Sequence, residues 1–148
     1  MKDVITIGSA TKDVFLVSQD FKLIKSKEFS TGVGECFAFG SKVEMKDLFT
    51  DTGGGATNSA VTCANLGLDV GVVTSVGFDS TGQEIIADLK DRNVDASLVY
   101  KHPTLKTGYS TILLSSVGDR TILVYRGAAQ VFGDENLKNS KKLKAKWF

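Results

Sequence analysis

The spacing of apolar residues predicts alternating strands and helices over much of the chain. An apolar run over 4–8 ends at a glycine and predicts a central strand of a parallel sheet. A narrow apolar stripe predicts a helix over 56–66, and the valines over 70–76 predict a buried strand after it. Residues 81–92 carry a second amphipathic pattern, and the hydroxyl of Ser80 is the predicted cap of that helix. This alternation is typical of an α/β protein.

A different pattern fills residues 14–52. Short β-like runs are separated by Gly and Ser turns, and no stretch has a helical period. The predicted strands are 14–17, 23–29, 37–39 and 43–49. Six of the nine phenylalanines lie in this segment, at positions 15, 21, 29, 37, 39 and 49. A small sheet this rich in aromatic rings exposes an apolar face unless something covers it.

The region from 98 to 126 predicts three more strands. Residues 98–100 form a short run, and the only histidine, His102, follows it in a predicted turn, where a solvated role is favoured over a catalytic one. The runs 109–115 and 121–125 predict a hairpin or two adjacent strands. These two strands can contribute to the same small sheet as residues 14–52.

Composition restricts the class of protein. The 148 residues are 42% apolar and 24% charged with a formal net charge of +1, so there is no overall field to attract nucleic acid or membrane. No apolar run reaches transmembrane length and the N-terminus has no signal-peptide pattern, which makes the cytoplasm the expected location. Cys36 and Cys63 are too far apart for a metal or redox pair and are expected to be half-buried or buried small side chains.

Three consecutive glycines, Gly53–Gly55, precede the first predicted helix and suggest a binding site. They can adopt positive φ and allow another molecule close to the backbone, beside the free N–H groups of a helix N-terminus. The P-loop pattern fails because no Lys follows, and the dinucleotide pattern fails because the glycines are contiguous. Asn58 remains, and its amide can donate and accept as a neutral polyol requires. A tight turn that packs the helix on the sheet is an equally compatible interpretation.

The same residues resemble the first signature of the ribokinase-like carbohydrate kinases, the PfkB family. Gly53–Ala60, then Gly67 and Gly77, fill every fixed position of that signature over 25 residues. The similarity continues through Gly77–Gly82, which looks like the family's G-x-D-x-x-G turn, and Tyr125–Ala129, which looks like its strand-end segment. The resemblance covers nearly the whole chain.

The resemblance implies a fold and a division of the chain. The expected fold is the N-terminal part of a ribokinase-like three-layer α/β sandwich with a small β-sheet lid. Residues 1–13 and 53–148 would belong to the kinase core, and residues 14–52 would form the lid, with strands from about 109–126 as a further contribution. In some relatives two lids clasp to form a dimer; packing of the phenylalanine rings within one subunit is the alternative, and both stay open.

The resemblance also implies which residues hold the substrate. Asp13 matches the acidic residue that hydrogen-bonds sugar hydroxyls, and Thr11 falls where many members have Asn; a solvated turn is the alternative for Asp13. Gly54, Gly55 and Asn58 would complete the sugar site. Arg126, at the end of a strand beside the substrate, could pair with a phosphate or carboxylate of an acidic sugar, or could be a surface cap of that strand.

The family's catalytic parts are not found in this sequence. Ribokinase-like kinases are roughly twice this long, and their later half carries the D-T-x-G-A-G-D turn with the anion hole and the general-base Asp. The only Asp-Thr-Gly here, Asp51–Gly53, lacks the later Asp. ATP and Mg²⁺ are therefore expected for the full-length enzyme with their sites outside this chain. We expect no ATP-dependent turnover from the 148-residue polypeptide, and detectable turnover would refute that expectation.

Two alternatives to a sugar kinase stay open. A nucleoside kinase of the same superfamily would also bind a ribose, and a non-catalytic sugar-binding or dimerising module would need no second half. The tail begins with acids at 134–135 and then accumulates lysines, an order that suits a helix dipole better than a nucleic-acid patch. Trp147 and Phe148 look like the opening of another buried element.

Overall fold

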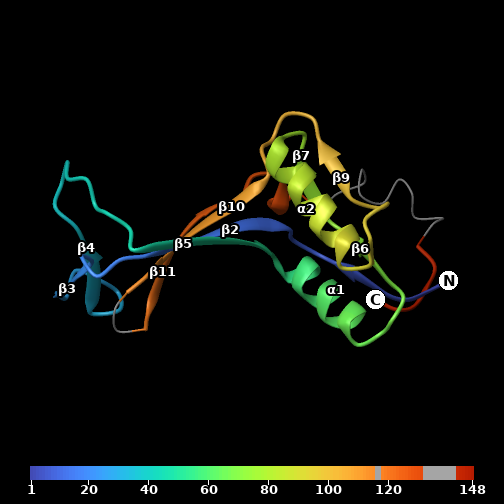
Figure 1. The fold of residues 1–148 in the computed structure, drawn as a ribbon, viewed down its shortest axis with the longest axis horizontal. Helices are drawn as coiled ribbons and strands as arrows, with labels where there is room; N and C mark the ends of the chain where they lie inside the picture. The colour runs from blue at the N-terminus through green and yellow to red at the C-terminus, as the bar shows by residue number, and fades with distance from the viewer. Residues whose placement is uncertain (116–117, 132–142) are drawn as a thin grey trace. The chain divides into compact units, whose positions relative to one another are not determined.

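The computed structural model describes residues 1–115, 118–131 and 143–148 (Figure 1). It divides the chain into two compact units. Unit 1 contains Met1–Asp13, Asp51–Ser110 and Val124–Phe148, and unit 2 contains Val14–Thr50 and Thr111–Leu123.

A parallel sheet forms the centre of unit 1. Its strands are β1 (Lys2–Ile7), β6 (Val70–Val73), β8 (Val94–Asp95) and β12 (Ala145–Trp147), in the order β12-β1-β6-β8. The pairings β1–β12, β1–β6 and β6–β8 are all parallel, and β1 lies inside the sheet as the sequence predicts. All four residues of β6 are buried, which explains its continuous apolar sequence.

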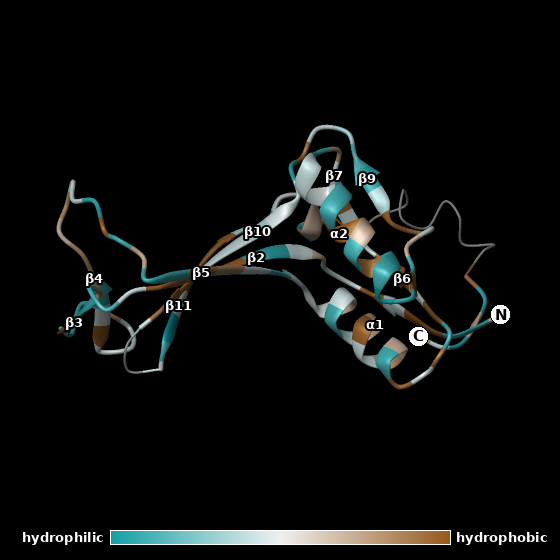
Figure 2. Ribbon diagram, in the orientation of Figure 1, coloured by the Kyte–Doolittle hydropathy of each residue, from teal (hydrophilic) through white to brown (hydrophobic). Residues whose placement is uncertain are grey.

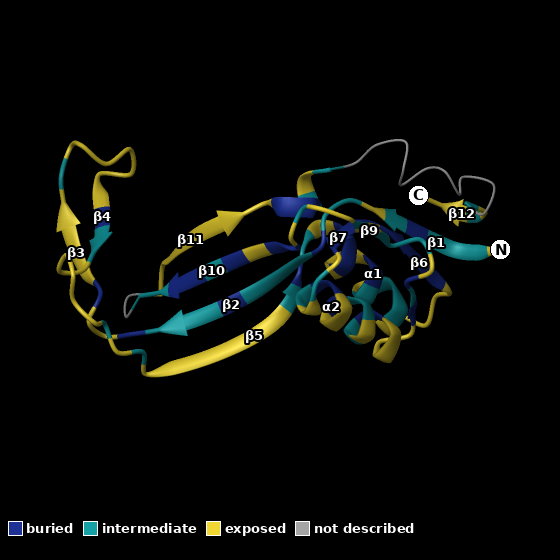
Figure 3. Ribbon diagram, turned by 90° about the horizontal axis from the view of Figure 1, so that it is seen from above, coloured by how far each residue is buried: buried dark blue, intermediate teal, exposed yellow. Residues whose placement is uncertain are grey.

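Two helices cover one face of this sheet. Helices α1 (Gly55–Asn65) and α2 (Ser80–Asp91) both lie on the same side of β1 and β6 (Figures 1 and 3). Their apolar side chains join those of the strands in one core, made of Ala10, Ala56, Ala60, Val70, Val72, Val76, Ile85, Leu89, Val94 and Ala96. Both predicted helices are confirmed, and α2 shows the mixture of polar and apolar positions that predicted it (Figure 2).

The predicted cap of α2 is wrong by one residue. Asp79 is the N-cap, in extended conformation, and its Oδ1 accepts a hydrogen bond of 2.9 Å from the N–H of Gly82. Ser80 is already the first helical residue. A carboxylate at the N-cap satisfies an N–H that the helix leaves unpaired, so Asp79 does the work that the sequence assigned to the neighbouring hydroxyl.

The single strand predicted over 70–76 is two strands. It breaks at Thr74, and β7 (Ser75–Gly77) pairs in parallel with β9 (Tyr100–His102) in a separate two-stranded sheet. The short strand predicted over 98–100 therefore lies two residues later, because its partner is β7. His102 is the last residue of β9 and not part of the turn that follows.

Unit 2 is built of strands. The sheet order is β11-β10-β2-β5, from β2 (Thr11–Val17), β5 (Asp47–Gly53), β10 (Gly108–Leu114) and β11 (Arg120–Tyr125), so the predicted neighbourhood of the last two is confirmed. Strands β3 (Lys22–Lys25) and β4 (Val33–Cys36) form an antiparallel pair. Figure 3 shows β10 largely buried, while β11 is exposed along its length and β5 is exposed except at its last two residues.

The aromatic segment of unit 2 differs from the prediction. Residues 37–39 are not a strand; they enter a turn in which the Ser41 N–H and hydroxyl both donate to the Ala38 carbonyl. The phenylalanines split into two groups. Phe15 stacks on Phe49 at a centroid distance of 4.5 Å, whereas Phe39 is fully exposed. The aromatic rings therefore do not form one continuous core within the described part of unit 2.

The remaining features lie near the C-terminus. A short 3-10 helix, η1 (Gly127–Gln130), follows β11. The tail predicted to place acids before lysines falls mostly on residues 132–142, outside the described ranges. Trp147 lies in β12, but it and Phe148 are 72% and 69% exposed, so neither is buried as predicted. No helix in the described ranges is long and apolar enough to cross a membrane.

Candidate functional site

Three segments of unit 1 are linked by contacts, and one of them contains the start of helix α1. The first is residues 9–13, which follow β1 and include the start of β2. The second is the glycine turn, Gly53–Asn58. The third consists of residues 106–108 and the start of η1. All six predicted site residues lie in or beside these three segments.

The glycine turn is filled by the chain's own atoms. A Cβ on Gly53 would overlap the Asp13 carboxylate, lying 2.5 Å from its Cγ. A Cβ on Gly54 would lie 2.8 Å from the Cα of Ala10, and Gly54 alone of the three glycines has positive φ, at +109°. At Gly55 the nearest atom would be the Ser9 Oγ at 4.0 Å. Gly53 is buried, so the expectation that all three glycines admit another molecule is wrong for Gly53; Gly54 is half-buried, and Gly55 is the most open of the three.

The first N–H groups of α1 are not free, contrary to the prediction. The Gly55 N–H donates to the Ser9 Oγ and the Ala56 N–H to the Ser9 carbonyl, both at 3.1 Å. A phosphate cradle needs such N–H groups for the anion, so this helix start does not fit the phosphates of ATP. In the described ranges no group of three or more His, Cys, Asp or Glu side chains is placed to hold a metal ion.

Thr57 and Asn58 have different tasks in the first turn of α1. The buried Thr57 hydroxyl lies within hydrogen-bond distance of the Gly53 carbonyl, at 2.7 Å, and of the Gly54 carbonyl, at 2.9 Å. This hydrogen bonding holds the glycine turn against the first turn of α1. Asn58 is exposed, and its backbone N–H donates to the Gly54 carbonyl at 3.0 Å. Its side-chain amide has no partner among the described residues, which leaves a donor and an acceptor at the surface beside Gly55.

Asp13 and Thr11 form a pair at the start of β2. The Thr11 hydroxyl donates to the Asp13 Oδ1 at 3.0 Å, and both residues are half-buried. Asp13 is therefore a strand residue held against the glycine turn, not the solvated turn residue of the alternative interpretation. The threonine hydroxyl fixes the orientation of the carboxylate and leaves it with further acceptor capacity.

Arg126 is joined to this region through its backbone. It is exposed and directly precedes η1, and its carbonyl accepts from the Ala129 N–H at 2.9 Å. The same carbonyl lies 3.0 Å from a Cβ built on Gly108, which would also lie 3.0 Å from the Thr11 Cγ2. Gly108 thus separates Arg126 from Thr11. The Arg126 guanidinium makes no hydrogen bond or ion pair among the described residues.

The second glycine turn, Gly77–Gly82, is closed around Asp79. Besides capping α2, Asp79 accepts from the Thr107 N–H at 2.9 Å and from the Thr107 hydroxyl at 2.6 Å. Burial acts to raise the pKa of the Asp79 carboxyl, but the hydrogen bonds from Thr107 and Gly82 outweigh it and hold the pKa below its ordinary value. This turn, part of the sequence resemblance, therefore acts as a scaffold.

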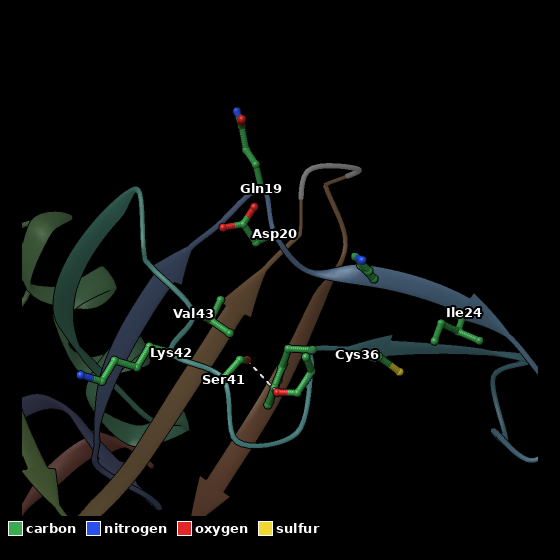
Figure 4. Close-up of a pocket in the computed structure, with 10 residues that line it drawn as sticks. Gln19, Asp20, Ile24, Cys36, Ser41, Lys42 and Val43 are labelled. Carbon is green, nitrogen blue, oxygen red and sulfur yellow. Dashed lines mark hydrogen bonds between the residues drawn. The ribbon is translucent and has the colours of Figure 1, made fainter.

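One cavity in unit 2 has no part in this arrangement. It has a volume of about 600 Å³ and is bordered by residues 19–24 and 36–43 (Figure 4). None of the six predicted site residues lines it. In Figure 4 the side chains of Gln19 and Lys42 extend away from the other labelled residues, so its polar groups do not converge on a common point.

Sequence reasoning missed two residues that shape the site. Ser9 received no role, although it occupies the N–H groups of the glycine turn, and Thr107 was not singled out. Neither has a local signal, because their partners are 46 and 28 positions away in the sequence. A glycine at 108, directly after Thr107 and at the start of a strand, is the one hint of close backbone packing there.

Three known relatives resemble this chain. The model described as pfkB family carbohydrate kinase matches residues 1–146. The ribokinase of Mus musculus is 28% identical over 137 residues, which is 93% of this chain and 38% of that protein. The structure of ribokinase from Giardia lamblia has a TM-score of 0.76 at 19% identity, covering 98% of this chain and 43% of that one. Arabidopsis thaliana ribokinase complexed with ribose and ATP has a TM-score of 0.71 at 22% identity, covering 93% and 41%.

The chain thus spans less than half the length of each of these relatives. At this identity the two structures show a shared fold. They confirm the predicted fold class, an α/β fold that corresponds to the N-terminal portion of the ribokinase-like architecture.

Proposed function

Because this chain belongs to the pfkB family of carbohydrate kinases, we propose that it carries the sugar-binding half of an enzyme that transfers the γ-phosphoryl group of ATP to a sugar hydroxyl. The observation that carries the proposal is the Thr11–Asp13 pair, held against the glycine turn beside the exposed amide of Asn58. These groups suit a neutral polyol because they offer oriented acceptors and a donor without a phosphate cradle.

Each residue has a defined task in this proposal. Asp13, oriented by Thr11, accepts hydrogen bonds from two neighbouring sugar hydroxyls. Asn58 donates to one hydroxyl oxygen and accepts from another, and the space above Gly55 lets the sugar approach the backbone. Gly54 adopts the positive φ that the backbone needs to turn from β5 into α1, which places Gly55 and Asn58 at the site. Arg126 pairs with a phosphate or carboxylate if the sugar carries one.

The nucleotide and metal belong to the proposal for the whole enzyme. ATP supplies the phosphoryl group and Mg²⁺ offsets its charge. We propose that their sites lie outside this chain; for the phosphates, the start of α1 supports this, since Ser9 accepts from its first two N–H groups. We propose the cytoplasm as the location, and we propose that unit 2, with residues 14–52, serves as the lid of the sugar site.

Titration with sugars tests the site directly. We expect D-ribose to bind the 148-residue chain and Asp13→Asn to weaken it by about tenfold, because the lost charge weakens two hydrogen bonds by an amount on the order of 1.4 kcal/mol. Asp91→Asn is the matched control, since Asp91 is an exposed carboxylate on α2 with no partner among the described residues. Equal affinities of wild type and Asp13→Asn would remove Asp13 from the site.

A nucleoside kinase is the first alternative. Because a nucleoside presents the same ribose hydroxyls, the panel includes adenosine and D-fructose beside D-ribose. Tighter binding of adenosine than of D-ribose would favour the nucleoside kinase.

A non-catalytic sugar-binding or dimerising module is the second alternative, and the exposed strand β11 favours it. Its residues Ile122, Leu123, Val124 and Tyr125 are each 45–56% exposed. An apolar strand of this kind is suited to a second copy of the chain. Sedimentation of wild type and Leu123→Asp tests it: a dimer that the substitution dissociates supports pairing through unit 2, and a wild-type monomer at micromolar concentration contradicts it.

A further inference from the structure

The segment Lys106–Gly108 is held from one side by Asp79. The Thr107 N–H donates to the Asp79 Oδ2 at 2.9 Å, and the Thr107 hydroxyl donates to the Asp79 Oδ1 at 2.6 Å. The same hydroxyl accepts from the Gly77 N–H at 2.9 Å. Thr107 is 3% exposed, so these hydrogen bonds are largely protected from water.

The two glycines of this turn make room for Thr107. A Cβ on Gly77 would lie 2.5 Å from the Thr107 N, and a Cβ on Gly82 would lie 2.9 Å from the Thr107 Oγ1. Both distances are too short for a side chain. The turn is therefore built around the inserted threonine. A second anchor precedes it, since the His102 Nδ1 accepts from the Leu105 N–H at 3.0 Å.

The other side of the same segment supports the candidate sugar site. The Lys106 carbonyl accepts from the Ala128 N–H at 2.8 Å. The preceding residue, Gly127, has a positive φ of +47°. Gly108 packs against both Thr11 and the Arg126 carbonyl, as its missing Cβ would lie 3.0 Å from each. A displacement of the segment would therefore move the start of η1 and remove the support beneath Thr11.

We infer that Asp79 is a positioning residue for the sugar site, acting through Thr107 to hold Lys106–Gly108 against Thr11 and the Arg126–Ala128 turn. The effect on sugar binding rests on the proposed function. The positioning of Lys106–Gly108 by Asp79 does not depend on it, because these contacts lie within unit 1. Asp79 touches no substrate in this scheme. Its carboxylate joins the Gly82 N–H, at the N-terminus of α2, to both the N–H and the hydroxyl of Thr107.

Helix capping alone does not account for these contacts. A cap requires a single acceptor for the Gly82 N–H, and Ser serves as well as Asp at that position. The contacts from Asp79 to Thr107 are additional, and a serine side chain at 79 is too short to make both of them. Asp79→Ser therefore keeps the cap and breaks the connection, which separates the two roles.

Amide hydrogen exchange at Ala128 tests the positioning. In Asp79→Ser and in Thr107→Val we expect the Ala128 N–H to exchange at least about tenfold faster than in wild type. Local opening of this segment costs less free energy in these variants, because there are no Asp79–Thr107 hydrogen bonds to break. Thr107→Ser restores the hydroxyl and should exchange within about twofold of wild type. The Gln83 N–H, which donates to the Asp79 carbonyl within α2, should stay protected in Asp79→Ser.

Titration with D-ribose tests the consequence for binding. Measured well below the melting temperature of each variant, the dissociation constant should rise by about five- to tenfold in Asp79→Ser and Thr107→Val, since a displaced site loses oriented contacts. Thr107→Ser and the control Asp91→Asn should match wild type. A purely structural role would lower the melting temperature and leave the dissociation constant unchanged.

The outcomes separate the two proposals. Unchanged Ala128 exchange in Asp79→Ser overturns the positioning role, whatever the sugar result. Faster exchange with an unchanged dissociation constant overturns its connection to the sugar site. If wild type binds no sugar while Ala128 exchange rises in both Asp79→Ser and Thr107→Val, the sugar-binding proposal fails and the positioning of the Arg126–Ala128 turn stands.

Discussion

Unit 1 contains two glycine turns that each lead into a helix, and they are completed in opposite ways. At Gly53–Asn58 the N-cap is Gly54, which has no side chain to cap α1, and Ser9 supplies both the hydroxyl and the carbonyl that meet the first N–H groups. At Gly77–Gly82 the N-cap is Asp79, and its carboxylate binds Gly82 and Thr107 together.

The difference decides which turn is open to a ligand. Thr107 fills the second turn and is 3% exposed, so nothing from outside can approach Gly77 or Gly82. In the first turn the filling stops at Gly54, and Gly55 and Asn58 remain exposed. Glycine before a helix therefore marks close packing in both cases, and the side chains that arrive from elsewhere determine whether a surface is left for binding.

The largest expected effect breaks the first turn. Gly54→Ala should lower the free energy of unfolding by about 3 kcal/mol or more, because it combines a left-handed backbone with a Cβ only 2.8 Å from the Cα of Ala10. Gly55→Ala is the matched control, with its nearest atom at 4.0 Å, and should change stability by less than about 0.5 kcal/mol. Urea denaturation measures both; equal losses would contradict the description of this turn.

The next effect compares the two caps. Asp79→Ala should cost about 2 to 4 kcal/mol, since it removes the cap of α2 and leaves the buried Thr107 N–H unpaired. Ser9→Ala should cost about 1 kcal/mol, because the N–H of Gly55 lies where water can replace the hydroxyl. Thermal unfolding of both variants gives the order, and a larger loss in Ser9→Ala would reverse the comparison.

A pH dependence sharpens the same contrast. The folded pKa of Asp79 is lowered, so its contribution to stability is fully present above the unfolded value of about 4. It is lost as the pH falls from there through the lowered folded pKa. We expect the free energy of unfolding, measured with urea between about pH 5 and 2, to fall less steeply with decreasing pH in Asp79→Asn than in wild type. An identical fall in both proteins would show that the pKa of Asp79 is not lowered by its hydrogen bonds in the folded state.

The smallest effect on stability belongs to the open turn. Asn58→Ala should change the free energy of unfolding by less than about 0.5 kcal/mol, because its amide is exposed and has no partner among the described residues. It should nevertheless weaken D-ribose binding by about tenfold, as it removes a donor and an acceptor. Ser59→Ala, also exposed on α1, is the control. Unchanged ribose affinity in Asn58→Ala would take this residue out of the site.

Local pattern was enough for the regular elements. The apolar stripe of α1 and its stop near Gly67 depend on residues within a few positions of one another, and the same holds for β1, β6 and α2. The pattern was insufficient at 37–39, where apolar residues enter a turn, and at Thr74, where one valine-rich run divides between two sheets. At Thr74 the pairing of β7 with the distant β9 decided the outcome, and at 37–39 the local hydrogen bonds from Ser41 to the Ala38 carbonyl accompany a turn.

The candidate site was predictable in part for the same reason. The proximity of Gly54, Gly55 and Asn58 follows from three adjacent positions at a helix start. The placement of Asp13 against Gly53, and of Gly108 between Thr11 and Arg126, depends on contacts across 40 and more than 90 positions. No spacing rule within one segment contains that information.

The sequence by itself determined the α/β class, the two helices, the strand-rich segment and the glycine loop, because side-chain periodicity and backbone freedom are local properties. The tertiary structure alone decided that Ser9 occupies the first N–H groups of α1, that Asp79 binds Thr107, and that Gly55 is the most open of the three glycines. These outcomes depend on which donors, acceptors and atoms are brought beside each turn, and those come from segments that meet only when the chain folds.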